Sequence, residues 1–376
     1  MNTPEVREQC AQRLLAGATT AGRLTAFAGL DGFVDEILHV VDKRDSENSF
    51  QRLATISQLA ERVAAAAGKS TNIEIVNRVT KLGGNGPIMA NALASFGLKV
   101  TYLGTLGWPH LHPVFADFAK RADVHSIAEP GHTDALEFDD GKVMIGKISS
   151  LNEVNWPNVQ SRFGRDRFAA QLAGADLVGF VNWTMLTHMN EIWEAALREI
   201  CPALKGKRRV MFFDLADPEK RKPDDIRRAL KTITDFEKYF DVILGLNEKE
   251  AYEIGEVLGL QPAGKSPDAL SGLALAINRL VPVNTLVIHP VSYALAAGNG
   301  AVSVVPGPFT PKPLITTGAG DHFNSGFCLG KLLGLDNGQS VLTGVATSGH
   351  YVRTAQSPGI ADLVKMLRHW PEESGE

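Results

Sequence analysis

A glycine-rich loop late in the 376-residue chain leads into a predicted helix that starts with a carboxylate. Gly318, Ala319 and Gly320 come directly before Asp321. Small residues where a loop turns into a helix let backbone N–H groups converge on an anion, and the helix dipole favours negative charge there. A carboxylate beside that anion could accept the proton of a hydroxyl group that attacks phosphorus. The pattern indicates phosphoryl transfer, and an aspartate that merely caps a helix is the alternative.

A second glycine cluster precedes another predicted helix, in the sequence KLGGNG. Gly83, Gly84 and Gly86 allow the backbone to approach a ligand closely. Asn85 lies among them and offers both a hydrogen-bond donor and an acceptor. The cluster therefore predicts a polar ligand site, and a tight turn without any ligand is the alternative.

Polar residues also follow several predicted strands. Asp31 and Asp35 lie where the first strand ends, and two carboxylates four residues apart can bind neighbouring hydroxyls of a polyol. Asn182 follows a second strand, and Asn247 and Glu250 follow a third. Because ligands of a parallel sheet gather at the carboxyl ends of its strands, we expect these side chains to share one edge. Solvated turn residues and an ordinary helix cap are the alternatives.

The elements that must position these residues alternate along the chain. Apolar runs predict strands at residues 24–30, 99–104, 176–181, 208–215, 241–246 and 284–289. Helical patterns occupy residues 86–97, 188–200, 223–236, 247–258, 266–280, 318–333, 337–354 and 359–369. Continuously apolar strands that alternate with helices are typical of a mostly parallel sheet covered on both faces.

Two stretches break this alternation. An amphipathic helix near residues 51–67 lies between extended segments, and residues 134–147 form a predicted hairpin around Asp-Asp-Gly. These segments predict a small second sheet beside the main one. Edge strands of the main sheet are the alternative.

The sequence from Thr316 to Asp321 resembles the second signature of the ribokinase-like (PfkB) carbohydrate kinases. The resemblance extends from about residue 24 to about residue 355. It implies a three-layer α/β sandwich with a mostly parallel central sheet and a small β lid. We expect one domain over residues 1–376, with lid segments at about 33–82 and 132–150.

The resemblance also implies roles for individual residues. Asp321 becomes the catalytic base, and the anion hole for the transferred phosphate comprises Thr317, Gly318, Ala319 and Gly320. The substrate-binding residues become Asp31, Asp35, Gly84, Asn85 and, more loosely, Asn182. Asn247 and Glu250 match an Asn-x-x-Glu motif that organises Mg²⁺, usually through water.

Some positions depart from the common family pattern. The sequence GGNxxIMAN at residues 83–91 is closer to the ADP-dependent glucokinase branch. The resemblance therefore allows either ATP or ADP as the phosphoryl donor. His289 and Pro290 stand where the family has Thr-x-Gly beside the nucleotide. A homodimer formed through the lid is compatible with the family.

Composition and charge exclude other classes of protein. The 38 basic and 42 acidic side chains give a net charge of −4, so no broad basic surface for nucleic acid is expected. Three scattered cysteines argue against a disulfide framework or a thiolate zinc site. No apolar run approaches the ~20 residues of a membrane span, and no signal peptide is recognisable, so we expect a cytoplasmic protein without a membrane partner.

These patterns together predict a kinase that transfers the terminal phosphoryl group of a nucleotide, with ATP expected, to a hydroxyl of a sugar with Mg²⁺. A nucleoside kinase and an ADP-dependent sugar kinase of the same fold are the near alternatives. A non-catalytic protein that senses sugar or nucleotide is the alternative from another class. The sequence lacks the GxxxxGK[ST] motif of a P-loop kinase. It also lacks GxGxxG after the first strand, which a Rossmann-type oxidoreductase would have.

Overall fold

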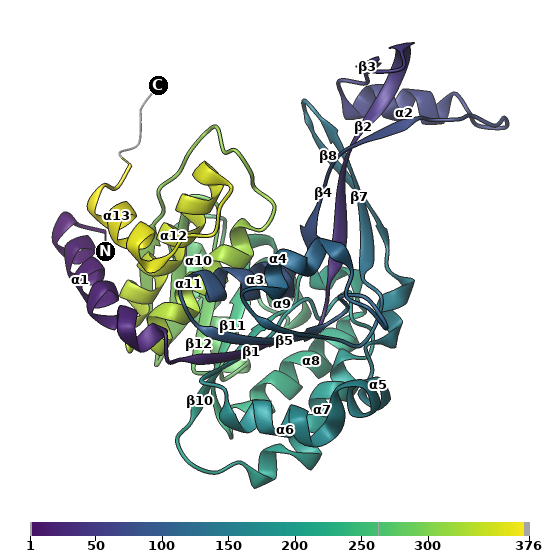
Figure 1. Cartoon of the computed structure of the whole chain (residues 1–376). Coiled ribbons are helices and arrows are strands. Elements are labelled where there is room, and N and C mark those ends of the chain that lie inside the picture. Colours follow the sequence, from purple (N-terminus) through teal and green to yellow (C-terminus); the bar gives the residue numbers. More distant parts are fainter. Residues whose placement is uncertain (1, 262, 372–376) are drawn as a thin grey trace.

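The computed structural model describes residues 2–261 and 263–371, and its centre is a nine-stranded sheet (Figure 1). The strand order is β14-β13-β12-β11-β10-β9-β1-β5-β6. All pairs from β12 to β6 are parallel, and β13 and β14 are added as an antiparallel edge. The strands are β1 (Thr25–Gly29), β5 (Lys99–Gly104), β6 (Asp123–Ser126), β9 (Leu177–Phe180), β10 (Arg209–Asp214), β11 (Phe240–Leu246), β12 (Thr285–Ile288), β13 (Tyr293–Gly298) and β14 (Ala301–Pro306).

Helices cover both faces of this sheet, because successive side chains of its strands point to opposite sides and both sides are apolar. In β1, Phe27 packs into one core and Ala26 into the other. One face carries α5 (Trp156–Asn158), α6 (Arg165–Gly174), α7 (Met189–Glu199), α8 (Pro223–Phe236), α9 (Glu248–Val257) and α10 (Pro267–Leu280). The other carries α1 (Pro4–Ala21), α3 (Asn85–Ser95), α4 (Ala116–Ala119), α11 (Ala319–Leu332), α12 (Asn337–Thr354) and α13 (Ile360–Arg368).

A second, five-stranded sheet projects from the sandwich and is called the lid here (Figure 1). It contains β2 (Phe33–Ser46), β3 (Ser49–Arg52), β4 (Ile75–Gly83), β7 (Gly131–Phe138) and β8 (Gly141–Lys147), with α2 (Ile56–Ala64) near its far end. The predicted hairpin is present, since Phe138 pairs with Gly141. A small separate core formed by lid strands and α2, including Leu38, Leu136 and Ile56, explains how the lid holds together away from the body.

The carboxyl ends of the central strands are level with one another. Gly29 pairs with Phe180, Asp214 with Gly245, and Leu246 with Ile288. The loops that follow these strands therefore open at one edge of the sheet, beneath the base of the lid. The α/β sandwich with a lid is confirmed. The strands and helices predicted for the sandwich are present to within a few residues, whereas β6, β13 and β14 were not predicted. Over the described residues, no helix has the length and apolar character that a membrane span requires.

Candidate active site

A cavity of about 440 Å³ lies at this edge of the sheet, between the sandwich and the base of the lid. It collects most of the residues that the sequence singled out: Asp35, Gly84, Asn85, Asn182, Asn247, Glu250, Thr317, Gly318, Gly320 and Asp321. Two predicted residues are absent from its lining, Asp31 and Ala319. The fold thus brings together side chains from segments at residues 35, 85, 182, 250 and 320.

The glycine loop enters α11 in a conformation that few other residues could adopt. Gly318 precedes the helix with a φ of +92°, and a Cβ there would lie 3.2 Å from Ile88. The Ala319 N–H donates to the Thr316 carbonyl at 3.1 Å, so this amide is occupied within the turn. Of the residues predicted for the anion hole, Thr317, Gly318 and Gly320 line the cavity, and their role stays a prediction.

Asp321 lies in the first turn of α11, and its side chain is 6% exposed. The Asn85 amide Nδ2 donates to Asp321 Oδ1 at 3.0 Å, which links the two glycine clusters directly. Burial, with repulsion from Asp214, raises the pKa of Asp321 well above its usual range, while the Asn85 hydrogen bond opposes the shift. A carboxylate with a raised pKa is a stronger proton acceptor once it is ionised.

Two more buried carboxylates lie beside Asp321. Asp214, at the end of β10, accepts from Asn324 Nδ2 at 2.8 Å, and burial raises the pKa of Asp214 to about 6. Glu250 accepts from the backbone N–H groups of Asn247 at 2.8 Å and Asp217 at 2.9 Å. Burial and the charge of Asp214 raise the pKa of Glu250 to about 8. The cavity lining therefore gathers several acidic side chains, and it also includes Lys220, which pairs with Asp217.

This donor set suits a hydrated divalent cation. Asn324 Oδ1 is buried beside Asp214 without a hydrogen-bond partner, and the Asn247 side chain is used as the cap of α9. Among the described residues, no three His, Cys, Asp or Glu side chains converge closely enough to hold a metal directly. Mg²⁺ keeps several waters and commonly takes only one or two carboxylates, which Asp214 and Glu250 can supply.

The lid forms the opposite wall of the cavity. Asp35 on β2 is 5% exposed; burial raises its pKa, while the Thr133 hydroxyl on β7 and the charge of Lys81 oppose that shift. Phe33 and Met144 add apolar surface beside these polar groups. A wall with carboxylate, hydroxyl and apolar patches is suited to a small polyol, whose faces alternate in the same way.

Asp31 lies behind the cavity, and its side chain is completely buried. Its carboxylate accepts from the N–H groups of Asn85 at 3.0 Å and Gly86 at 2.9 Å, where α3 begins, and from Asn182 Nδ2 at 2.8 Å. Gly84 has a φ of +95°, and a Cβ there would come within 2.9 Å of the Asp31 carboxylate. The expected direct contact between Asp31 and a substrate does not fit this placement, because Asp31 is enclosed by protein donors.

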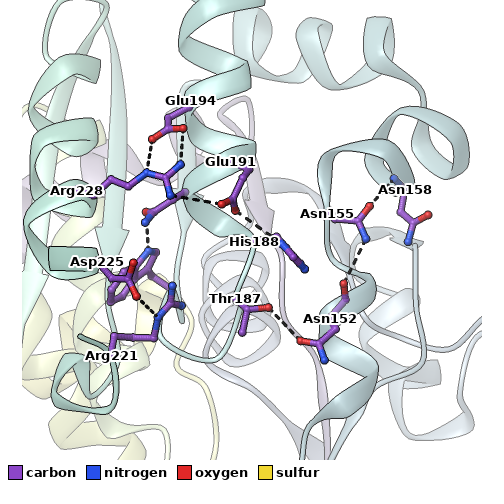
Figure 2. Close-up of polar contacts among 12 residues, drawn as sticks. Asn152, Asn155, Asn158, Thr187, His188, Glu191, Glu194, Arg221, Asp225 and Arg228 are labelled. Carbon is purple, nitrogen blue, oxygen red and sulfur yellow. Dashed lines mark hydrogen bonds and ion pairs between the residues drawn. The ribbon is translucent and has the colours of Figure 1, made fainter. Parts of the chain in front are cut away.

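Polar contacts of the neighbouring helices support the loop that follows β9, and Figure 2 shows one of them, the ion pair of Arg221 with Asp225. The Arg221 guanidinium stacks on the buried Trp183 ring at 4.4 Å and pairs with Asp225 at 3.5 Å. The Trp183 indole N–H donates to Asn190 Oδ1 at 2.8 Å. Asn182 itself has a φ of +59°, a left-handed conformation that asparagine tolerates better than most residues. This loop is therefore a rigid support for the amide of Asn182.

An apolar pocket of about 320 Å³ adjoins the glycine loop on the side away from the lid. It is lined by residues that include Tyr293, Phe309, Phe323 and Val352, and it shares His289 and Gly320 with the main cavity. The His289 ring is buried, which lowers its pKa to about 4, so it is neutral at physiological pH. A flat apolar ring system next to an anion loop would fit this arrangement.

Several of these residues escaped the sequence analysis for identifiable reasons. Asp214 could have been found, because it is a carboxylate at the end of a predicted strand, like Asp31. Thr133 and Met144 lie in a hairpin whose sequence says nothing about which way the lid faces. The apolar pocket is assembled from loops and helix faces far apart in the chain, and no local pattern marks it.

The sandwich, the lid and the glycine loop together define the chain as a ribokinase-like protein. A ribokinase from Arabidopsis thaliana, solved with ribose and ATP, has a TM-score of 0.63 at 15% identity, over 92% of this chain and 98% of that one. A nucleoside kinase from Methanocaldococcus jannaschii has a TM-score of 0.60 at 14% identity, with the same coverage of 92% and 98%. At this identity the likeness concerns the fold.

A family model described as prokaryotic ketohexokinase matches residues 2–370, and the chain belongs to that family. A ketohexokinase from Haloferax volcanii is 29% identical over 337 residues, which is 89% of this chain and 88% of the relative. The protein is thus a carbohydrate kinase, a phosphotransferase with an alcohol group as acceptor, as its sequence predicted. The likeness of residues 83–91 to ADP-dependent glucokinases stays a prediction.

Proposed function

We propose that the protein is an ATP-dependent ketohexokinase, which transfers the terminal phosphoryl group of ATP to a hydroxyl of fructose with Asp321 as general base. The observation that carries this proposal is the position of Asp321. Its carboxylate lies between the glycine loop and the sugar-facing wall, and Asn85 fixes one of its oxygens. The family and the haloarchaeal relative support a ketohexose as the acceptor.

The acceptor binds between the lid and the sandwich. Asp35 accepts hydrogen bonds from the sugar on the lid side, where Thr133 adds a hydroxyl, and Asn182 and Asn85 contact the sugar from the sandwich side. Bound in this way, one hydroxyl of the sugar points at Asp321. Fixing the attacking oxygen near the phosphorus removes much of the entropic barrier of a bimolecular reaction.

Ionised Asp321 takes the proton of that hydroxyl as the oxygen attacks phosphorus. Backbone N–H groups of Gly318 and Gly320 stabilise the negative charge that builds on the transferred phosphoryl group, aided by the N-terminal end of the α11 dipole. The oxygen–phosphorus bond to the sugar forms while the bond to the leaving diphosphate breaks. Closing the lid over the sugar limits access of water, which would otherwise accept the phosphoryl group.

Mg²⁺ would be held by Asp214 and Glu250, mainly through water, with Asn247 positioning Glu250. When bound, it supplies positive charge to the phosphates of the nucleotide. Its charge also offsets the repulsion that raises the pKa of Asp321. The adenine ring occupies the apolar pocket beside His289, and ADP as the donor would use the same pocket.

A panel of acceptors and donors tests this function. D-fructose, D-glucose, D-ribose, adenosine and cytidine are each incubated with ATP or with ADP and Mg²⁺, and products are identified by mass. We expect fructose phosphate from ATP as the fastest product. Faster phosphorylation of a nucleoside, or transfer from ADP alone, would replace the proposal with the corresponding alternative. Sugar binding without any product would favour a sensing protein.

A further inference from the structure

We infer that Asp31 does not touch the sugar but sets the polarity of the contact that Asn182 makes with it. Asp31 holds the amide group of Asn182 so that its carbonyl oxygen, and not its NH₂, faces the cavity. Asn182 then accepts a hydrogen bond from one sugar hydroxyl. This role depends on the chain binding a sugar, as proposed.

The first step is the chemistry of the two side chains. An ionised carboxylate has only acceptors, so the group that faces Asp31 across 2.8 Å must be the NH₂ of Asn182. Burial raises the pKa of Asp31 only to about 6, which leaves it ionised at neutral pH. The opposite amide orientation would bring two acceptors together without a proton between them. The carboxylate therefore fixes an orientation that an isolated asparagine would leave open.

The second step is what remains of the amide. Asn182 Oδ1 is buried and has no hydrogen-bond partner, although Asn182 is 3% exposed and lines the cavity. A buried carbonyl oxygen without a donor is unfavourable, so such atoms normally have a partner. A sugar hydroxyl in the cavity supplies the missing donor.

The third step is rigidity. The backbone beside Asn182 is fixed, since the Thr184 N–H donates to the Leu215 carbonyl at 2.9 Å and Arg221 stacks on Trp183. The carboxylate of Asp31 is equally fixed by the first two N–H groups of α3. The remaining freedom is rotation of the Asn182 amide group about its Cβ–Cγ bond, and the carboxylate of Asp31 fixes that rotation.

Fluorinated sugars test whether Asn182 accepts a hydrogen bond from a sugar hydroxyl. In a series of D-fructose analogues, each hydroxyl except the one that is phosphorylated is replaced in turn by fluorine, which can accept weakly but cannot donate. The ratio of kcat/KM for D-fructose to kcat/KM for each analogue is measured with ATP and Mg²⁺. In the wild type, the analogue that lacks the hydroxyl bound by Asn182 should have a kcat/KM about tenfold lower than that of D-fructose. This is the effect expected from the loss of one hydrogen bond.

Two substitutions and their combination test the pair. Asn182→Leu removes the acceptor and should abolish the ratio at that one position. Asp31→Asn lets the neighbouring amide turn over, and should lower the ratio at the same position and at no other. In Asp31→Asn/Asn182→Asp, the new amide donates to the new carboxylate, whose second oxygen again offers an acceptor to the cavity, and the ratio should return. The swap removes an acceptor from the Asn85 N–H, so its thermal stability should fall even as the ratio recovers.

Asn278→Asp is the matched control, because Asn278 is a half-buried carboxamide of α10 that donates to the Val283 carbonyl and lies outside the cavity lining. Its ratios should match the wild type. Unchanged ratios in Asn182→Leu would overturn the acceptor role. If the double variant Asp31→Asn/Asn182→Asp gives a kcat/KM ratio no higher than that of Asp31→Asn alone, the role of Asp31 is overturned. If Asp31→Asn does not fold, Asn182→Asp, with two carboxylates facing each other, replaces it as the reference for the swap. A wild type that phosphorylates no fructose would instead refute the proposed function.

Discussion

The two walls of the active site are built in different ways. The proposed phosphate side is one continuous stretch, residues 316–321 at the start of α11, where backbone amides would bind the phosphate. The sugar side takes side chains from β2, β7, the start of α3 and the loop after β9. A site made of local backbone geometry leaves a readable motif in the sequence. A site made of converging side chains depends on how distant segments meet.

The two sides also differ in charge. Asp214, Glu250 and Asp321 gather toward the phosphate side, where burial raises the pKa of each, and the charge of Asp214 adds to the shifts of Glu250 and Asp321. On the sugar side, Asp35 is the carboxylate of the lid, and the charge of Lys81 opposes its pKa shift. The phosphate side is thus electrostatically poised for a cation, whereas the sugar side is suited to neutral hydroxyls.

The largest expected effect comes from the group between the two walls. Asp321→Asn keeps the shape of the site but removes the proton acceptor, so kcat should fall by about 10²–10⁴ while the KM for sugar changes little. Steady-state kinetics with the best acceptor measure both constants. Asp224→Asn, at an exposed aspartate of α8, serves as control. A kcat within a factor of three of the wild type would mean that another group takes the proton.

A change to the phosphate side should act on nucleotide and turnover together. Gly318→Ala places a Cβ at a φ of +92° and 3.2 Å from Ile88, which distorts the anion loop. We expect kcat/KM for ATP to fall by about 10- to 100-fold, less than the loss of a whole oxyanion donor. Gly334→Ala carries a similar backbone strain at a φ of +72° in open space, and separates this effect from lost stability. Equal losses in both variants would argue against an anion loop.

The charge difference predicts how stability depends on pH. The pKa of Glu250 is about 8 in the folded protein and near 4.5 when unfolded, so between these values the folded state binds the extra proton. The free energy of unfolding therefore falls as pH rises through this window. The buried His289 and His322, each with a pKa of about 4, act in the opposite direction, but only below pH 6.5.

Thermal unfolding at pH 6.5 and pH 8.5 isolates the carboxylates. Glu250→Gln should reduce the loss of Tm between these pH values by about 1–3 °C relative to the wild type. Added Mg²⁺ should raise the Tm more at pH 8.5 than at pH 6.5. Glu248→Gln, two residues earlier on α9, should lose as much Tm between these pH values as the wild type. If Glu250→Gln loses as much Tm between pH 6.5 and pH 8.5 as the wild type, the titration of Glu250 does not explain the loss of stability.

The smallest expected effect lies on the sugar side. Thr133→Val removes the hydroxyl beside Asp35 without changing the shape of the wall. We expect the KM for sugar to rise about threefold to tenfold, as for the loss of one hydrogen bond, with the KM for ATP unchanged. Thr285→Val, at a buried threonine on β12, controls for packing. If only the KM for ATP rose, Thr133 would belong to the nucleotide side, and the assignment of the two walls would be reversed.

The sequence predicted the fold well because its signals are local. Apolar runs predicted β1, β5 and β9 to β12, and helix patterns predicted α3 and α7 to α13. The loop from Gly318 to Asp321 could be interpreted for the same reason. Ala319 shows the limit of such a motif, since its amide is used inside the turn.

By itself, the sequence determined the sandwich, the glycine loop and the carboxylate that follows it, because periodicity and short motifs depend on neighbours along the chain. Tertiary structure decided which of two similar aspartates faces the cavity. Asp31 is turned inward because the start of α3 and the amide of Asn182 supply its donors, while Asp35 is carried to the cavity on a lid strand. Those donors are 54 to 151 residues away in the chain, so only the folded protein brings them into contact.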